Sequence, residues 1–128
     1  MQPIRLLGDG YEPHVELTDG QLSYSLPVDS GVVSFSFSFA ISQRDLDVLL
    51  DDDYRRAVLE VIAHTLLQHS ALPGNPRFSQ SDFDSLVTDT LHSTSDALED
   101  FIARVRREHH IVIEKYVQDI LHRRLHTQ

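Results

Sequence analysis

Apolar residues recur at every second position through the first forty residues, which is the spacing of a half-buried β-strand. Short strands are expected at residues 4–7 and 14–17, and Leu22, Tyr24 and Leu26 alternate with polar neighbours in a third. Glycine, proline and aspartate mark the turns between these segments, at 8–10, 19–20, 27 and 29–31. This order predicts an antiparallel meander with one buried face.

The strongest strand pattern covers residues 32–41. One face of this strand carries its apolar side chains, Val33, Phe35, Phe37, Phe39 and Ile41. The other face carries serines, at 34, 36 and 38. Aromatic rows at strand spacing usually belong to a core. The alternative is that the same row lines a ligand cavity.

After Ile41 the apolar spacing changes to three and four residues, as in amphipathic helices. Ser42 and Asp45 have the spacing of a capping box and predict the start of a short helix. The aspartates at 51–53 can end this helix and cap a second one, whose apolar stripe covers residues 54–69.

Two further helical stretches are expected. Prolines and a glycine at 71–77 prevent a helix from continuing there, and Ser81 can cap the third helix. Thr94 or Ser95 can cap the last stretch, which contains no glycine or proline before residue 128. That stretch forms either one helix of about 30 residues or two helices that break near 109–110, where β-branched residues follow.

Strands that all precede helices predict an α+β fold rather than alternating βαβ units. We expect a single domain over residues 1–128, with a β-meander at 1–41 and a helical part at 42–128. The sheet would have three or four antiparallel strands, packed on one face by three to five C-terminal helices.

The charge is unevenly distributed along the chain. Residues 1–53 hold ten acids and two bases, residues 54–100 hold seven and three, and residues 101–128 hold three and six, for a net charge of −9. Such an acidic protein repels nucleic acid and attracts cationic proteins. Cysteine is absent, and no signal peptide or membrane-spanning run is visible, so a cytoplasmic protein is expected.

Aspartates are densest between residues 45 and 53, where capping alone does not require so many. The candidate partner-binding residues in this segment are Asp45, Asp47, Asp51, Asp52 and Asp53. A second candidate group consists of Asp82, Asp84 and Asp89. Both groups are read either as solvated helix ends or as a negative surface that faces a partner. A calcium loop is disfavoured because the alternating ligands, central glycine and closing glutamate are missing.

The sequence contains no convincing catalytic, metal or cofactor motif. His122 and His126 share a helix face, but the arginines between them would repel a divalent cation, and no third ligand is evident. No serine lies in a Gly-x-Ser-x-Gly turn, and no glycine-rich phosphate loop is present. We therefore expect no catalytic residue, no metal and no cofactor.

The segment FSFSFAISQRDLDVLLDDDYRRAVLEVIAHTLLQ, residues 35–68, resembles the strand-then-helices segment of small immunity proteins from bacterial polymorphic toxin and contact-dependent inhibition systems. In these families an alternating strand leads into a DLxVLL turn and an RRxVLExxxHxxLQ helix. The resemblance implies a non-enzymatic cytoplasmic protein that binds a cognate toxin domain and blocks it. The resemblance identifies no partner-binding residue in this chain, because such families diverge at the positions that contact the partner.

The residues agree with this implication, since an acidic inhibitor suits a toxin with a basic surface. The expected partner is thus a cognate toxin protein, with no nucleic acid or membrane, and the protein itself is a monomer or weak homodimer. Two other functions remain open. The chain is alternatively an adaptor that oligomerises through its long C-terminal helix, or a small hydrolase that uses a His/Asp pair.

Overall fold

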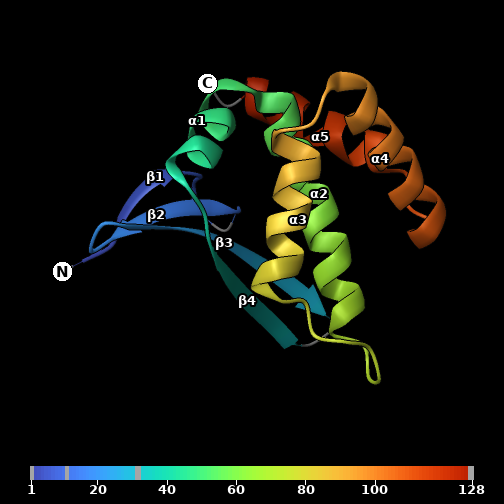
Figure 1. The fold of residues 1–128 in the computed structure, drawn as a ribbon, viewed down its shortest axis with the longest axis horizontal. Helices are drawn as coiled ribbons and strands as arrows, with labels where there is room; N and C mark the ends of the chain where they lie inside the picture. The colour runs from blue at the N-terminus through green and yellow to red at the C-terminus, as the bar shows by residue number, and fades with distance from the viewer. Residues whose placement is uncertain (1, 11, 31–32, 127–128) are drawn as a thin grey trace.

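The first part of the chain forms an antiparallel β-sheet. The computed structural model describes residues 2–10, 12–30 and 33–126, with the side chains at 29–30, 33–35 and 126 outside that description. The strands are β1 (Ile4–Leu7), β2 (His14–Thr18), β3 (Gln21–Ser30) and β4 (Val33–Ala40). They lie side by side in chain order, each antiparallel to the next (Figure 1).

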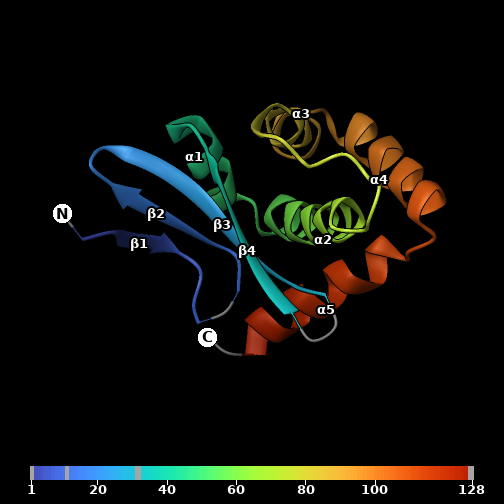
Figure 2. The same ribbon diagram turned by 90° about the horizontal axis from the view of Figure 1, so that it is seen from below.

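Helices make up the second part. Over the described residues they are α1 (Gln43–Asp51), α2 (Asp53–Ser70), α3 (Gln80–Leu91), α4 (Ser95–His109) and α5 (Ile113–His126). Figure 2 shows the helices gathered on one side of the sheet. Helix α2 contacts β3 and α3 contacts β4, while α5 packs along α2 and α4 contacts both α3 and α5. The expected α+β class is confirmed.

Helix α2 lies at the centre of the hydrophobic core. The sheet, α1, α3 and α5 all contact it, so every residue from 57 to 63 is buried. Apolar side chains are expected all round a helix in such a position. Glu60 is the exception within this run, and only 5% of its surface is exposed.

Strand β3 is longer than its sequence pattern predicts. The turn expected at Pro27 is wrong, because β3 continues to Ser30 and Pro27 pairs with Ser36 of β4. Proline has no backbone N–H to donate and is tolerated where a strand lacks one neighbour. The pairing of β2 with β3 extends no further than Ser25. At Pro27, strand β3 therefore pairs with β4 but not with β2. Gly31 of the expected turn lies outside the described residues.

The phenylalanine face of β4 belongs to the core, as predicted, where its side chains are described. Phe39 and Ile41 are buried, Phe37 is half-buried, and the described serines opposite are exposed. The Phe39 ring stacks on Phe83 of α3 with their centroids 4.4 Å apart. This packing favours the core interpretation over a ligand cavity; the side chains at 33–35 are not among those described.

The helix starts mostly follow the predicted caps. Ser42 and Asp45 form both halves of a capping box at α1. Asp52 caps α2 by accepting from the backbone N–H of Arg55, and Thr94 caps α4. These side chains satisfy N–H groups that have no partner within their own helix.

Helix α3 begins earlier than predicted. Ser79, not Ser81, is its N-cap, and Ser79 forms a capping box with Asp82. The backbone N–H of Asp82 donates to Ser79 Oγ over 3.1 Å, and the backbone N–H of Ser79 donates to Asp82 Oδ2 over 2.9 Å. Ser81 has an acid at the same spacing, Asp84, so the capping-box spacing alone does not distinguish the two serines, and the structure places the helix start at Ser79.

The C-terminal stretch is two helices rather than one. Helix α4 ends at His109, and His110 adopts the left-handed conformation with φ of 54°. This turn allows α5 to fold back against α2. Five apolar side chains of the two helices are consequently buried within the monomer, while Val112 and Tyr116 remain exposed at 56% and 47%; the buried ones are Leu98, Ile102, Val105, Ile113 and Val117.

The cap of α3 is testable with two serine variants. Ser79→Ala removes the hydroxyl that accepts from the backbone N–H of Asp82 and keeps the backbone N–H of Ser79, and it should lower the free energy of unfolding by about 1 kcal/mol. Ser81→Ala is the matched control within the helix, where alanine is a good helix former, and should change stability by less than about 0.5 kcal/mol. Urea denaturation measures both values. Equal effects of the two variants would contradict the observed cap.

Candidate functional site

Three of the five aspartates predicted at the junction of α1 and α2 face solvent. Asp47, Asp51 and Asp53 are all exposed. Asp47 accepts a hydrogen bond from Gln43 Nε2 over 2.9 Å, while Asp51 ends α1 and Asp53 begins α2. These three carboxylates are therefore open to a partner.

The other two aspartates of this group hold the fold together. Asp45 is part of the α1 capping box, and its Oδ1 lies 2.6 Å from Nε2 of His92, the C-cap of α3. Asp52 caps α2, and its Oδ2 lies 3.5 Å from Nε of Arg55. Because these carboxylates already have partners within the chain, they offer less to another protein.

The second predicted group is spread along α3. Asp82 and Asp84 are exposed near the start of this helix. Donation from the backbone N–H and hydroxyl of Ser79 lowers the pKa of Asp82, and Asp84 accepts from Gln80 Nε2 over 2.8 Å. Asp89 is half-buried in the last turn. This group is thus tied mainly to α3 itself.

Exposed acids also occur in the first turns of α4, which a side-chain contact links to the start of α2. The Tyr54 hydroxyl of α2 donates to Glu99 of α4 over 2.8 Å, which places the starts of the two helices side by side. Burial and this hydrogen bond raise the pKa of Tyr54 to about 12. We define the acidic edge as six exposed residues: Asp47, Asp51, Asp53, Asp96, Glu99 and Asp100.

Arginines of α4 and α5 form ion pairs with acids outside the acidic edge. Arg106 Nη1 lies 2.6 Å from Glu114, and Arg104 Nε lies 3.9 Å from Glu108. Arg124 pairs with Glu12 and Glu60. Over the described ranges, no ion pair between these arginines and the acidic edge is found, so the edge keeps its negative charge.

A buried cluster of four charged side chains lies where α2, α5 and the β1–β2 connection meet. Arg124 Nη2 is 2.5 Å from Glu60 Oε1 and 3.3 Å from Glu12 Oε2. Arg56 lies 3.6 Å from each of the same two carboxylates. Two guanidinium groups and two carboxylates thus compensate one another, which buried charges require.

Burial and pairing act in opposite directions on the pKa values of this cluster. Desolvation raises the pKa of Glu60 and outweighs the two neighbouring guanidinium groups. Glu12 is less buried, so the Asp9 N–H and Arg124 overcome its desolvation and lower its pKa. The two carboxylates overcome the desolvation of Arg124 and raise its pKa.

Tyr24 extends the cluster into the core. Its side chain is 1% exposed, and its hydroxyl has no hydrogen-bond partner among the described residues. Desolvation, with a contribution from Glu60, raises the pKa of Tyr24 well above its ordinary value. The phenol therefore stays protonated beside the charged groups.

Sequence reasoning missed this cluster. A signal was present, because Glu60 interrupts a run of apolar residues in the middle of α2. Its main partner, Arg124, is 64 residues away. Periodicity does not reveal such distant pairs.

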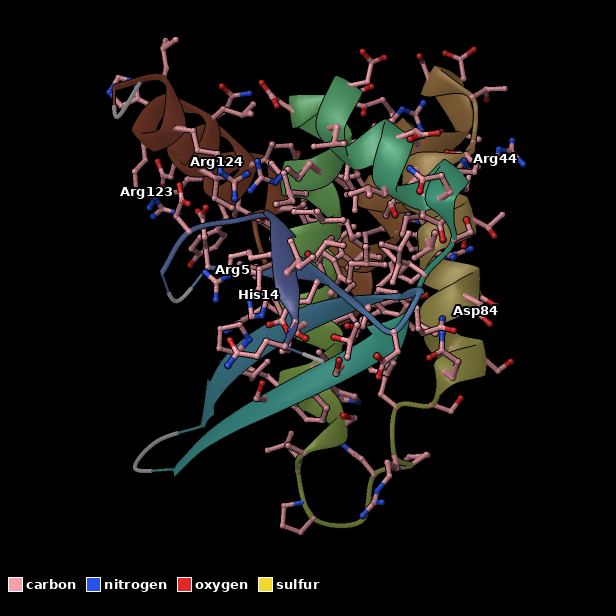
Figure 3. All side chains as sticks on the ribbon, turned by 90° about the vertical axis from the view of Figure 1, so that its left-hand side faces the viewer. Arg5, His14, Arg44, Asp84, Arg123 and Arg124 are labelled. Carbon is pink, nitrogen blue, oxygen red and sulfur yellow. The ribbon has the colours of Figure 1, made fainter. Side chains whose placement is uncertain are left out.

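Two cavities lie beside the cluster. One, of about 750 Å³, is lined by four arginines: Arg5, Arg56, Arg123 and Arg124. The other, of about 480 Å³, is mainly apolar and includes Val61 and Ile120. Glu12 and Arg123 line both. Figure 3 shows Arg5, Arg123 and Arg124 on the same side of the molecule.

The geometry gives little support to hydrolysis or metal binding. His92 and Asp45 form a His/Asp pair, but neither lines any of the three described cavities. Within the described residues no group of three or more histidine and acidic side chains is placed to hold a metal ion. The side chain of His126, half of the predicted histidine pair, lies outside that description.

Comparisons with known proteins give no further guidance. No protein-family model, curated protein or solved structure matches this chain significantly. Among the described helices, none is long and apolar enough to cross a membrane.

The raised pKa of Glu60 makes stability depend on pH. The folded protein holds the Glu60 proton more tightly than the unfolded chain, so this contribution is fully present below the ordinary pKa of 4.5 and is lost as the pH rises through the raised value. Glu60→Gln has no such titration. We expect the unfolding free energy of the wild type to fall relative to that of Glu60→Gln between about pH 4 and about pH 7.

Urea denaturation of both proteins across this pH range measures the difference. The lowered pKa of Glu12 gives a pH dependence of opposite sign. Glu12 is present in both proteins, so its contribution cancels in the difference between their unfolding free energies when its contacts are the same. A difference that stays constant or grows with pH would show that pairing, rather than burial, dominates at Glu60.

Proposed function

We propose that this protein is an immunity protein that binds a cognate toxin domain with a basic surface and neutralises it without catalysis. The acidic edge is the observation that carries the proposal. Its six exposed carboxylates have no ion-pair partner among the arginines of α4 and α5 within the described chain. A concentrated negative surface of this kind accelerates association with a cationic protein.

The middle of the acidic edge also offers an apolar contact. Leu50 lies between Asp47 and Asp51 in sequence, and 55% of its surface is exposed. Protein interfaces commonly combine a small apolar centre with a charged rim. Leu50 would supply the centre and the aspartates the rim.

The resemblance to immunity proteins covers the same region. Residues 35–68 form most of β4, all of α1 and most of α2, and the junction between the two helices contributes three residues of the acidic edge. The resemblance assigns no contact residue, so the position of the interface rests on the exposed charge alone.

The two alternative functions receive less support from the structure. An adaptor that oligomerises through one long C-terminal helix is disfavoured because this stretch is two helices, and Leu98, Ile102, Val105, Ile113 and Val117 are buried in the monomer, although Val112 and Tyr116 are exposed. A hydrolase needs its His/Asp pair in a cavity, and the observed pair joins α1 to α3 instead.

The gene order and a growth assay test the proposal directly. We expect the neighbouring upstream reading frame to encode a secreted protein whose C-terminal domain stops bacterial growth when expressed inside the cell. Co-expression of the present chain should restore growth. The absence of a toxic domain in that reading frame, or toxicity that this chain does not relieve, would refute the immunity function.

Binding kinetics with that toxin domain test the acidic edge. The double variant Asp47→Asn/Asp51→Asn should slow association roughly twofold to tenfold at low ionic strength, and the difference should vanish at about 1 M salt. The matched control is Glu108→Gln/Glu114→Gln, which removes the same charge where α4 meets α5 and should change the rate less. Stopped-flow measurement of the association rate distinguishes the pairs, and equal slowing by both would exclude the edge as the contact.

The apolar centre has its own test. Leu50→Ala should weaken the complex about tenfold, chiefly by faster dissociation, because Leu50 would be buried at the interface. Leu72→Ala is the control, since Leu72 is similarly exposed, at 53%, in the loop after α2. If both variants bind as tightly as the wild type, Leu50 is not part of the interface.

A further inference from the structure

The cavity of about 750 Å³ concentrates arginine in a protein that is otherwise strongly acidic. Four of the ten arginines line it, and they come from β1, α2 and α5. Three carboxylates share its walls: Asp9, Glu12 and Asp53. The walls therefore carry one excess positive charge, although the whole chain carries −9.

The four arginines differ in whether a carboxylate balances their charge. Arg56 and Arg124 pair with Glu12 and Glu60. Arg5 instead donates from Nη1 to the backbone carbonyls of Gly8 and Gly10, over 3.5 and 3.2 Å. Arg123 is exposed. Across the described chain, neither Arg5 nor Arg123 forms an ion pair with a carboxylate.

The loop between β1 and β2 fixes the position of this cavity wall. Gly8 has φ of +91°, and a Cβ at this position would lie 2.4 Å from the Pro13 carbonyl oxygen. The backbone N–H of Asp9 donates to Glu12 Oε1 over 2.8 Å, and that of Glu12 donates back to the Asp9 carbonyl. Arg5 bonds to the same loop, so its guanidinium group is held in place before any ligand arrives.

We propose that this cavity binds the phosphate group of a small phosphomonoester, independently of the toxin-binding function. Each guanidinium group presents a planar fork of donors that matches phosphate oxygens. A phosphate monoester is close to a dianion at neutral pH and above, which suits the two arginines that lack a carboxylate partner. Leu6 and Leu7 also line the cavity and provide an apolar surface for the organic part of the ligand.

Calorimetric titration of the full chain with phenyl phosphate and with inorganic phosphate tests this site. Both titrations are run at about pH 8, where phosphate is dianionic, and at one fixed ionic strength. We expect saturable binding of phenyl phosphate, tighter than inorganic phosphate by about tenfold because of the apolar wall. Equal affinities for the two probes would refute the assignment to an organic phosphomonoester.

A pair of double variants locates the site. Arg5→Gln/Arg123→Gln should weaken phenyl phosphate binding roughly 10-fold to 100-fold, because two charge-assisted contacts are lost. Arg44→Gln/Arg77→Gln removes the same charge from exposed positions that do not line the cavity and should change affinity less than about threefold. Figure 3 shows Arg44 on the opposite side of the view from Arg5 and Arg123.

The possible results all bear on the proposal. Equal weakening by the two double variants would mean that phosphate responds to overall charge, and an absence of saturable binding would mean that no site exists. Either result overturns the proposal. Neither arginine belongs to the acidic edge, and the one residue that the two regions share, Asp53, is unchanged in Arg5→Gln/Arg123→Gln. Relief of toxicity in the growth assay should therefore persist in this variant, which separates this site from the immunity function.

Discussion

The arrangement of helices around the sheet depends on how the charge of Glu60 is compensated. This carboxylate lies in the most enclosed stretch of α2, where an unpaired charge would be very unfavourable. Arg56, one turn earlier on the same helix, approaches only to 3.6 Å, and the short contact comes from Arg124 of α5. Removing one partner of such a buried pair typically costs about 3–5 kcal/mol, a large part of the roughly 5–15 kcal/mol that stabilises a domain. The same arginine also holds Glu12, so one side chain joins α5, α2 and the β1–β2 connection.

The acids of this chain serve two different purposes. Asp45, Asp52 and Asp82 satisfy backbone N–H groups at the starts of helices, which fixes where α1, α2 and α3 begin. The acids of the acidic edge have no such task and remain exposed. Both kinds occur next to each other along the chain because helix starts favour negative charge. The starts of α2 and α4 meet through Tyr54 and Glu99, which links the exposed acids of the two helix starts.

Charges of opposite sign are separated on either side of the first turn of α2. Asp53 belongs to the acidic edge and also lines the arginine cavity, so the two regions adjoin at that residue. Arg124 and Arg56 are held on the cavity side by Glu12 and Glu60. If those arginines instead reached the aspartates of α1 and α2, both the negative surface and the positive cavity would be lost. The buried cluster thus maintains the charge distribution on which both proposed sites depend.

Local chemistry made much of the fold predictable from the sequence. Alternation identified the strands and the core face of β4, and capping residues identified the starts of α1, α2 and α4, because each signal lies within a few neighbouring residues. Where a residue was compatible with two local structures, its neighbours in the folded chain determined which structure formed. Pro27 is compatible with a turn, but the pairing of β2 ends at Ser25 and leaves Pro27 a place in β3. Ser79 and Ser81 each precede an aspartate by three residues, and the folded chain begins α3 after Ser79.

What the sequence alone determined is the order of strands and helices, most of their boundaries and the excess of negative charge. Tertiary structure decided which charges remain exposed and which compensate one another inside. The physical reason is range: capping and periodicity act over three or four residues, whereas Glu60 and Arg124 meet across 64 residues and only after α5 has folded back at His110. Burial then sets the energy of that contact, and burial is a property of the packed chain rather than of any segment.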